Sequence, residues 1–483
     1  MNKRHAKILC LVMAVYLALA SMFFLIAREQ LYYRDSHTDM LSTATTVGEI
    51  TVHREIRQRF VPKGSWITSV SLRMGTFARE NTAQLTVSIE DASGTVLHTV
   101  TVPSCGLTDN EVMSLPLDTP LPVTKGQPLY LVLTSPDGVP GNAVTVCLGN
   151  SISAGKAAVA RKIAPEDLAT VDGAPQDGSL CFQIYERSEL LVGKIYWYAV
   201  ACLGLILLIY ALRTCRLAFQ GKTNRFLTCA AIFRRYSFLM KQLILRDFKS
   251  RYKRSVLGVL WSFLNPLLTM LVQYVVFSTL FRGDIPNYSL YLLTGIVCFN
   301  FFSEATSNAS QSIVDNTPLI TKVYVPKIIY PTASVVSSAI NLLLSIIPLV
   351  IVMLITGAYP KPAMLLLPYG LLCLIFLSTG IGLVLATGMV FFKDVQFLWN
   401  ILVMLWMYMT PIFYPASIIP APLLPIYRCN PMYQVVTFCR TILIDGDPPS
   451  PSAYFACFLC AAIPMVIGLT LFRKKQDEFI LHL

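Results

Sequence analysis

Charged side chains are scarce in this chain of 483 residues. Only 14% of its residues are Asp, Glu, Lys or Arg, and 54% are hydrophobic, whereas a soluble globular protein carries about 25% charged residues. This composition excludes an entirely soluble protein and predicts an integral membrane protein with several spans of about 20 residues each. The net charge of +12 does not indicate nucleic-acid binding, because Lys and Arg cluster beside apolar runs, where the positive-inside rule accounts for them.

The chain also lacks the residue patterns of common hydrolases and metal enzymes. Its five histidines have no zinc-ligand spacing, and no Gly-x-Ser-x-Gly is present. Two near matches to a phosphate-binding loop fail. In residues 149–158 the spacing is one residue too long and Ala157 follows the lysine, and Gly-Lys-Thr at 221–223 has Arg216 where the upstream glycine is required. We therefore expect no enzyme activity, no metal and no cofactor on this chain, so any uphill transport would draw its energy from a partner or an ion gradient.

Cysteine is present, but not in a pattern that builds a site. Most of the 13 cysteines fall inside apolar runs, where Cys behaves as a small hydrophobic residue. Cys105, Cys147 and Cys181 lie in a segment of soluble character. Three thiols allow at most one internal disulfide there, and the sequence does not choose the pair.

The N-terminal half has the pattern of a soluble domain between two membrane anchors. Residues 1–30 combine a basic start with the apolar run 8–27, which is typical of an uncleaved signal anchor, although Ala-Leu-Ala at 18–20 imitates a cleavage site. A second apolar run at 190–212 precedes a cluster of Lys and Arg that marks the cytoplasm. The intervening segment, residues 45–187, is therefore expected outside the cytoplasm.

The pattern within residues 45–187 predicts an antiparallel β-sandwich. Apolar side chains alternate with period two, and turn sequences separate the runs; the alternating sets are Val70, Leu72 and Met74, then Leu85, Val87 and Ile89, then Leu129, Leu131 and Leu133, then Val144, Val146 and Leu148. The alternation resembles that of jelly-roll carbohydrate-binding modules. Sugar binding by this domain is therefore a hypothesis.

The C-terminal half, residues 234–483, predicts a polytopic helical domain. An amphipathic helix at 235–254 carries Phe238, Leu245, Phe248 and Tyr252 on one face and basic residues on the others, which is typical of a helix lying in the headgroup layer. Six apolar runs follow as spans, at 256–281, 290–313, 331–356, 364–392, 396–414 and 454–472. The proline-rich segment 415–451 is too broken to span and is expected as short re-entrant or interfacial helices on the outer side. The topology has eight spans with both termini in the cytoplasm.

Four stretches of this half resemble one transporter family. They are "MKQLILRDFKSRYKRSVLGVLWSFLNPLLTMLVQYVVF" from Met240, "TPLITKVYVPKIIYP" from Thr317, "FFKDVQ" from Phe391, and "NPMYQVVTFCRTILIDG" from Asn430. In order, spacing and topology they closely resemble the permease subunit of ABC-type polysaccharide exporters, the O-antigen and teichoic-acid export family. The resemblance covers about half of the chain and leaves the N-terminal half as an added module.

The resemblance implies a division of labour between chains. A separate ABC ATPase subunit would bind ATP and Mg²⁺, and this chain would form a homodimeric permease in a bacterial cytoplasmic membrane that exports a lipid-linked polysaccharide. The amphipathic helix and a coupling loop at 315–327 would meet the ATPase. The residues expected at that interface are Arg246, Lys249, Arg251, Tyr252, Lys253, Arg254, Thr321, Lys322, Val323 and Tyr324.

The resemblance also implies a translocation path lined with aromatic rings, whose faces stack on the apolar faces of sugars. The candidates are Tyr288, Tyr291, Phe299, Phe301, Phe302, Phe413 and Tyr414, together with Glu304, because an ionisable residue inside an apolar span is costly and usually faces protein or water. Each has a plainer interpretation. The aromatic residues can serve packing, Glu304 can sit near the cytoplasmic mouth, and the basic residues of 235–254 can be only a topology signal.

Two other functions fit parts of the sequence. An ABC exporter of a small lipid or drug would use the same helical frame. A membrane-anchored glycan sensor or chain-length regulator would share the anchor, outer domain and second anchor, but it needs only two spans and leaves the six-span half without a purpose. The sequence does not specify the polymer, its lipid carrier, the ligand of the outer domain or the Gram type of the host.

Overall fold

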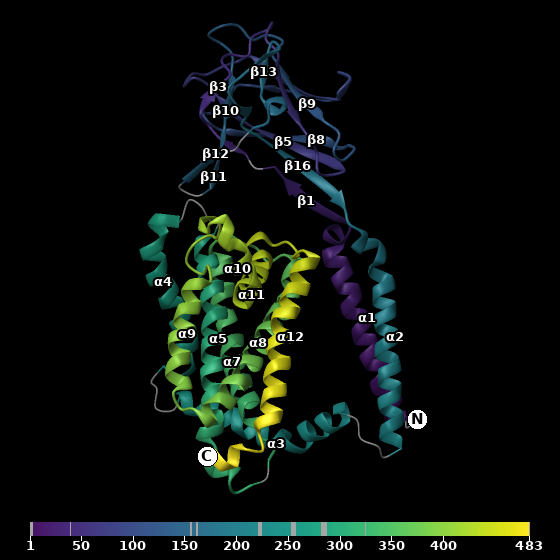
Figure 1. Cartoon of the computed structure of the whole chain (residues 1–483), viewed down its shortest axis with the longest axis vertical. Coiled ribbons are helices and arrows are strands. Elements are labelled where there is room, and N and C mark those ends of the chain that lie inside the picture. The colour runs from purple at the N-terminus through teal and green to yellow at the C-terminus, as the bar shows by residue number, and fades with distance from the viewer. Residues whose placement is uncertain are drawn as a thin grey trace. The chain divides into compact units, whose positions relative to one another are not determined.

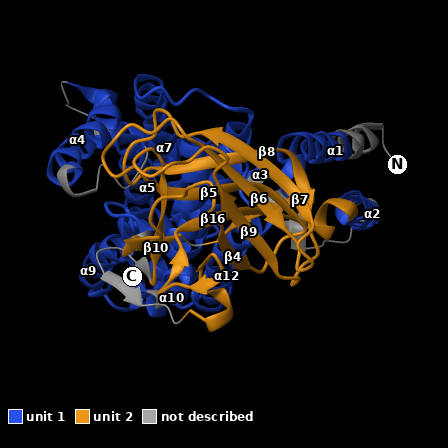
Figure 2. Ribbon diagram, turned by 90° about the horizontal axis from the view of Figure 1, so that it is seen from above, with its two compact units in different colours: residues 1–30, 195–483 blue, residues 31–194 orange. Residues whose placement is uncertain are grey.

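The chain divides into two compact units, which Figure 2 colours separately. The computed structural model describes residues 3–482 except 39, 155–156, 161–162, 221–224, 253–256, 282–286 and 324. One unit, residues 31–194, has strands as its main regular structure, and the other, residues 1–30 and 195–483, is helical. The strand-rich unit is somewhat longer than the predicted segment 45–187.

The strand-rich unit contains two large antiparallel sheets. One has seven strands in the order β1-β16-β5-β10-β15, with β8 paired to β5 and β3 to β10, and the other has the order β14-β13-β4-β9-β6-β7; β12-β11-β2 form a third, small sheet. The strands are β1 (Tyr33–His37), β2 (Leu41–Ser42), β3 (Thr45–Thr46), β4 (Ile56–Phe60), β5 (Trp66–Gly75), β6 (Gln84–Glu90), β7 (Val96–Pro103), β8 (Val112–Pro122), β9 (Leu129–Thr134), β10 (Thr145–Gly149), β11 (Ser151–Ala154), β12 (Ala157–Ala160), β13 (Thr170–Val171), β14 (Ala174–Pro175), β15 (Ser179–Leu180) and β16 (Phe182–Glu189). The predicted β-sandwich is confirmed.

The core of this unit comes from the predicted alternation. The alternating side chains of β5, β6 and β9 are buried in one cluster between the sheets. The turn between β6 and β7 forms because the Asp91 carboxylate accepts hydrogen bonds from the backbone N–H groups of Ser93 (2.8 Å) and Thr95 (2.9 Å), while Gly94 takes φ +84°, a conformation that glycine adopts without strain.

Strand β10 departs from simple alternation, since all five of its residues are buried. Its second face carries Cys147, which packs with Leu41 and Cys181 in a cluster separate from the main core. The Cys181 N–H donates to the Cys147 carbonyl oxygen at 2.8 Å, and both cysteines are free thiols. Burial raises the pKa of the Cys147 thiol above its usual value and that of the Cys181 thiol to about 11, so both thiols are neutral at physiological pH.

The helical unit contains all of the long helices (Figure 1). They are α1 (Lys3–Tyr32), α2 (Leu191–Phe219), α3 (Arg225–Tyr252), α4 (Trp261–Phe281), α5 (Tyr288–Asp315), α7 (Ile329–Ile355), α8 (Leu367–Phe391), α9 (Val395–Met409) and α12 (Pro451–Lys475); the short ones are α6 (Thr317–Ile320), α10 (Leu424–Cys429), α11 (Pro431–Arg440) and α13 (Phe479–His482). Among the described residues, six helices are long and apolar enough to cross a membrane, namely α1, α2, α4, α7, α8 and α12. The other two predicted spans are helical as α5, whose second half is polar, and α9, which has 15 residues.

Helices α1 and α2 pair as a hairpin (Figure 1). The Tyr16 hydroxyl donates to the Val200 carbonyl at 2.8 Å, and the Tyr196 hydroxyl donates to the Ala20 carbonyl at 2.8 Å. Gly204 lets the Tyr16 ring approach, since a Cβ there would lie 3.2 Å from it. The tyrosines thus bury their polar ends against backbone oxygens, which an apolar solvent cannot satisfy.

The remaining helices form a bundle whose centre is α5, α7 and α8. Helices α8 and α12 approach at Gly380 and Gly468, where a side chain on either glycine would clash with the backbone of the other helix. Such small residues permit the close helix contacts on which membrane helices depend. This bundle fixes α5 and α7, which carry most of the site described below.

Helix α3 packs against one end of the bundle by a different face from the predicted one. Leu243 is buried in a cluster with Ile320 of α6 and Phe479 of α13. Phe238, by contrast, leaves 73% of its surface exposed. Helix α3 is therefore apolar on two sides, one covered by protein and one that would meet lipid.

The segment between α9 and α12 is a set of short helices, as its prolines predict. Helix α9 ends at Met409, before Pro411 and Pro415, because proline removes a helical hydrogen bond. Two single turns (Ala416–Ile418 and Ala421–Leu423), α10, α11 and a π-helical turn (Thr441–Asp445) follow.

Candidate functional site

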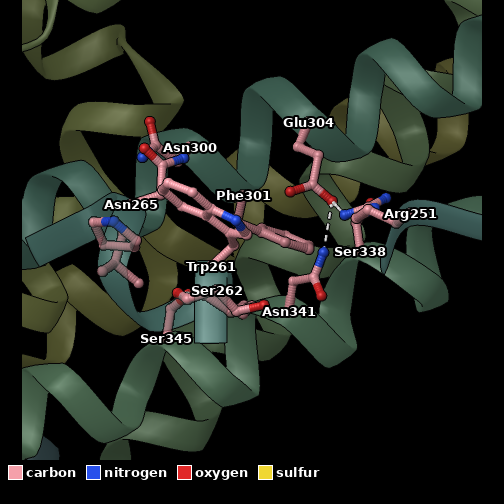
Figure 3. Close-up of a pocket in the computed structure, with 13 residues that line it drawn as sticks. Arg251, Trp261, Ser262, Asn265, Asn300, Phe301, Glu304, Ser338, Asn341 and Ser345 are labelled. Carbon is pink, nitrogen blue, oxygen red and sulfur yellow. Dashed lines mark hydrogen bonds and ion pairs between the residues drawn. The ribbon is translucent and has the colours of Figure 1, made fainter. Parts of the chain in front are cut away.

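A cavity of about 370 Å³, here called pocket 1, lies among the helices of the bundle. Four helices build it, and six of its 13 lining residues carry amide or hydroxyl side chains (Figure 3). Its lining residues are Arg251 of α3, Trp261, Ser262, Asn265 and Pro266 of α4, Val297, Asn300, Phe301 and Glu304 of α5, and Ser338, Asn341, Leu342 and Ser345 of α7.

The Glu304 carboxylate is the point at which three of these helices meet. One of its oxygens accepts hydrogen bonds from the Arg251 guanidinium and from the Asn341 amide at 3.2 Å (Figure 3). The side chains of Arg251 and Glu304 keep 28% and 36% of their surface exposed, so they face the cavity rather than the packed core. Pairing the two charges makes an acid tolerable inside an apolar bundle.

A second polar cavity of about 310 Å³, here called pocket 4, lies between α3, α5 and α7. Arg251 lines both cavities. Helix α3 contributes Arg246, Asp247 and Ser250, and α5 contributes four further polar residues, from Asn308 to Asp315. The hydroxyl of Ser337, which also lines pocket 4, is buried and has no hydrogen-bond partner among the described residues, so it is available to water or a ligand group.

The chemistry of pocket 1 suits a ligand rich in hydroxyl groups. Asn and Ser side chains donate and accept hydrogen bonds, the Glu304 carboxylate accepts them, and Trp261 and Phe301 offer apolar ring surface. Binding sites for small polar ligands combine such convergent polar groups with apolar walls.

The residues predicted to meet an ATPase divide into two groups. On α3, Arg246 donates to Asn316 Oδ1 at 3.0 Å and so touches the start of α6, Lys249 is exposed, and Arg251 turns into pocket 1. In the loop after α6, Thr321, Lys322 and Val323 are exposed. Lys253, Arg254 and Tyr324 lie outside the described residues, and for Tyr252 only the backbone is described.

The predicted channel-lining aromatics lie mostly within the packed bundle. Tyr288, Phe299, Phe302 and Phe413 are buried, and Phe302 packs its ring on Trp399 and Trp406. Phe301 lines pocket 1. A lining role for this set stays a prediction, because the structure describes a single chain.

Tyr288, Tyr291, Phe413 and Tyr414 gather where the chain leaves α9. The Tyr291 hydroxyl donates to the carbonyl oxygens of Pro411 (3.1 Å) and Tyr414 (2.8 Å), and the Tyr288 hydroxyl donates to that of Phe413 at 2.7 Å. These bonds hold the irregular backbone of residues 411–414, which needs internal partners at membrane depth.

Arg440 at the end of α11 completes this anchoring and was not among the predicted residues. It is 7% exposed and donates four hydrogen bonds to the carbonyl oxygens of Tyr291, Pro411 and Ile412. Its guanidinium carbon lies 3.3 Å from the centroid of the Tyr291 ring. Arg440 and Tyr291 also line a third cavity, of about 240 Å³.

Sequence reasoning missed several other lining residues of pocket 1, chiefly Trp261, Asn265, Asn300 and Asn341. The argument that singled out Glu304 would have found the three asparagines, since each places a polar group in an apolar run.

Comparisons with known proteins concern this same half of the chain. Residues 239–444 match the family model of the ABC-2 type transporter. The O-antigen export system permease protein RfbA of Myxococcus xanthus is 29% identical over 246 residues, which are 50% of this chain and 95% of that protein. A protein of the same name from Klebsiella pneumoniae is 28% identical over 48% of this chain and 90% of its own length. The polysialic acid transport protein KpsM of Escherichia coli is 25% identical over 50% of this chain and 95% of its own length.

Proposed function

Because residues 239–444 of this chain belong to the ABC-2 type transporter family, we propose that the protein is the permease subunit of an ABC exporter that carries a polysaccharide across the cytoplasmic membrane. The relatives are named for O-antigen export and polysialic acid transport, which supports a polymer over a small lipid or drug. The observation that carries the proposal is the agreement of these matches with a polar, ring-flanked cavity in the matched helices.

The energy for export comes, in this proposal, from a separate ABC ATPase subunit that binds ATP and Mg²⁺. The exposed loop at Thr321–Val323 and the basic face of α3 dock on it, and the link from Arg246 to Asn316 joins these two elements. Two copies of the chain form the permease with two copies of the ATPase.

The strand-rich unit lies outside the cytoplasm and both termini lie inside. This orientation places the basic residues in the last turns of α2 (Arg216) and α12 (Arg473, Lys474 and Lys475) on the cytoplasmic side. The substrate is a lipid-linked polysaccharide of the O-antigen or teichoic-acid type, and the outer unit receives or orients the emerging glycan.

Substitutions in the loop after α6 test the docking assignment. The double variant Lys322→Glu/Val323→Asp is expected to lower the amount of polysaccharide on the cell surface by at least about tenfold. Reversing the charge of a docking surface costs more than about 1.4 kcal/mol of binding free energy. Less ATPase should copurify with the variant permease, ATP hydrolysis by the separately purified ATPase should be unaffected, and the amount of permease in the membrane should not change.

The matched control is Phe392→Asp/Lys393→Glu, which makes the same change in net charge and also replaces one apolar residue by Asp, at another exposed pair on the same side of the bundle. It should keep export near the wild-type level. Full export by the Lys322 and Val323 double variant would remove this loop from the interface.

A further inference from the structure

The interface helix and the substrate cavity share one residue. Arg251 belongs to the last turn of α3, yet its guanidinium pairs with Glu304 in the middle of α5. The Glu304 oxygen that it contacts also accepts the Asn341 amide of α7. One carboxylate oxygen therefore connects α3 to two walls of pocket 1 (Figure 3).

The same pair stands where two cavities come together. Arg251 lines pocket 1 and pocket 4, whereas Glu304 lines pocket 1 only. Moving the guanidinium away from Glu304 would therefore change the lining of both cavities, of about 370 and 310 Å³. No other residue is common to both linings in the described part of the chain.

We propose that the Arg251–Glu304 pair is a latch that couples movement of α3, driven by the ATPase, to the access of sugar hydroxyl groups to pocket 1. This inference rests on the proposed function. With the latch closed, the Arg251 guanidinium forms an ion pair with the Glu304 carboxylate. With the latch open, that carboxylate accepts hydrogen bonds from the hydroxyl groups of a glycan segment, and Asn341 keeps it oriented.

The contacts around the pair distinguish a latch from a packing contact. Helix α3 is held to the bundle without Arg251, because Leu243 is buried in the cluster with Ile320 and Phe479 and Arg246 bonds Asn316. Both partners of the pair are partly exposed to the cavity, so opening it exchanges one polar environment for another instead of burying a bare charge. A sugar hydroxyl is a suitable replacement donor for Glu304.

Charge exchange tests the latch. Arg251→Glu and Glu304→Arg each place like charges together and should lower surface polysaccharide by at least about tenfold. The double variant Arg251→Glu/Glu304→Arg restores an ion pair between the same helices and should recover at least about half of the export. Arg428→Glu, which makes the same change of charge at an exposed arginine of α10, should export normally.

A labelling experiment separates a moving pair from a static one. The sample is the purified complex of the Asn300→Cys permease with its ATPase. N-ethylmaleimide is added, and mass spectrometry measures how fast it modifies the introduced thiol. The rate is compared with and without ATP and vanadate, which together trap the ATPase in one state. The proposal predicts at least about a threefold difference between the two states. It also predicts that adding Arg251→Gln abolishes this difference.

Two results would overturn the latch while leaving the proposed function intact. They are failure of the double exchange variant to export although it reaches the membrane in normal amount, and persistence of the nucleotide-dependent labelling after Arg251→Gln. A different result would contradict the proposed function itself, namely unchanged surface polysaccharide after deletion of the whole gene.

Discussion

The Arg440→Met variant is expected to lose about 3 kcal/mol or more of stability, because it removes four hydrogen bonds that a charged side chain donates to carbonyl oxygens inside the bundle. Methionine keeps the length and apolar contacts of the side chain but cannot make the four hydrogen bonds to Tyr291, Pro411 and Ile412. The irregular backbone after α9 would then depend on the hydroxyl groups of Tyr288 and Tyr291 for its side-chain hydrogen bonds. The measurement is the apparent melting temperature of the detergent-solubilised protein.

Two variants calibrate this result. Arg440→Lys keeps the charge but reaches fewer acceptors, so its melting temperature should lie between those of wild type and Arg440→Met. Arg428→Met removes an exposed arginine of α10 and should change the melting temperature little. If Arg440→Met and Arg428→Met had the same melting temperature, the anchoring role of Arg440 would be wrong.

Ser345→Trp is expected to lower surface polysaccharide by at least about tenfold, because the indole would occupy pocket 1. Ser345 lines that cavity and donates to the Ser262 carbonyl across it at 3.3 Å. A large ring at this position therefore removes the space that the account assigns to sugar units. Polysaccharide is measured on intact cells, and the membrane content of the variant is measured in parallel.

The neighbouring variant Leu343→Trp supplies the control. It adds the same ring on the same helix at a side chain that is 61% exposed, where lipid can accommodate it. Export near wild type for Leu343→Trp and loss for Ser345→Trp, at equal membrane content, is the expected pair of results. Equal export by both variants would mean that the polymer does not use pocket 1.

Local sequence patterns predicted most strands and helices, because the formation of a strand or helix depends largely on residues that are close in the sequence. The alternation at Val70, Leu72 and Met74 specifies one buried face of β5 wherever the strand sits in the sheet. The double burial of β10 was not predictable, since Cys147 is covered by Leu41 and Cys181, whose proximity only the folded topology creates. The end of α9 at Met409 follows from Pro411, although the prediction extended that span to 414.

The site was predicted only in part, because its contacts join residues that are far apart in the sequence. Glu304 stood out because it is a charge in an apolar run, and Arg251 because it lies in a basic segment. Their pairing joins residues 53 positions apart and depends on how α3 packs beside α5. Arg440 had a signal in its sequence, a charge within an apolar segment, but its three backbone acceptors come from α5 and from the turn after α9.

The location of the polysaccharide in a strain that lacks this gene tests the central claim most directly. Cells of the wild type, the deletion strain and the deletion strain carrying the gene on a plasmid would be fractionated, and the polymer would be quantified on the surface and inside. The account predicts that deletion removes the polymer from the surface, that it accumulates in the cytoplasm or on the inner leaflet, and that the plasmid reverses both effects. Unchanged surface polysaccharide in the deletion strain would contradict it.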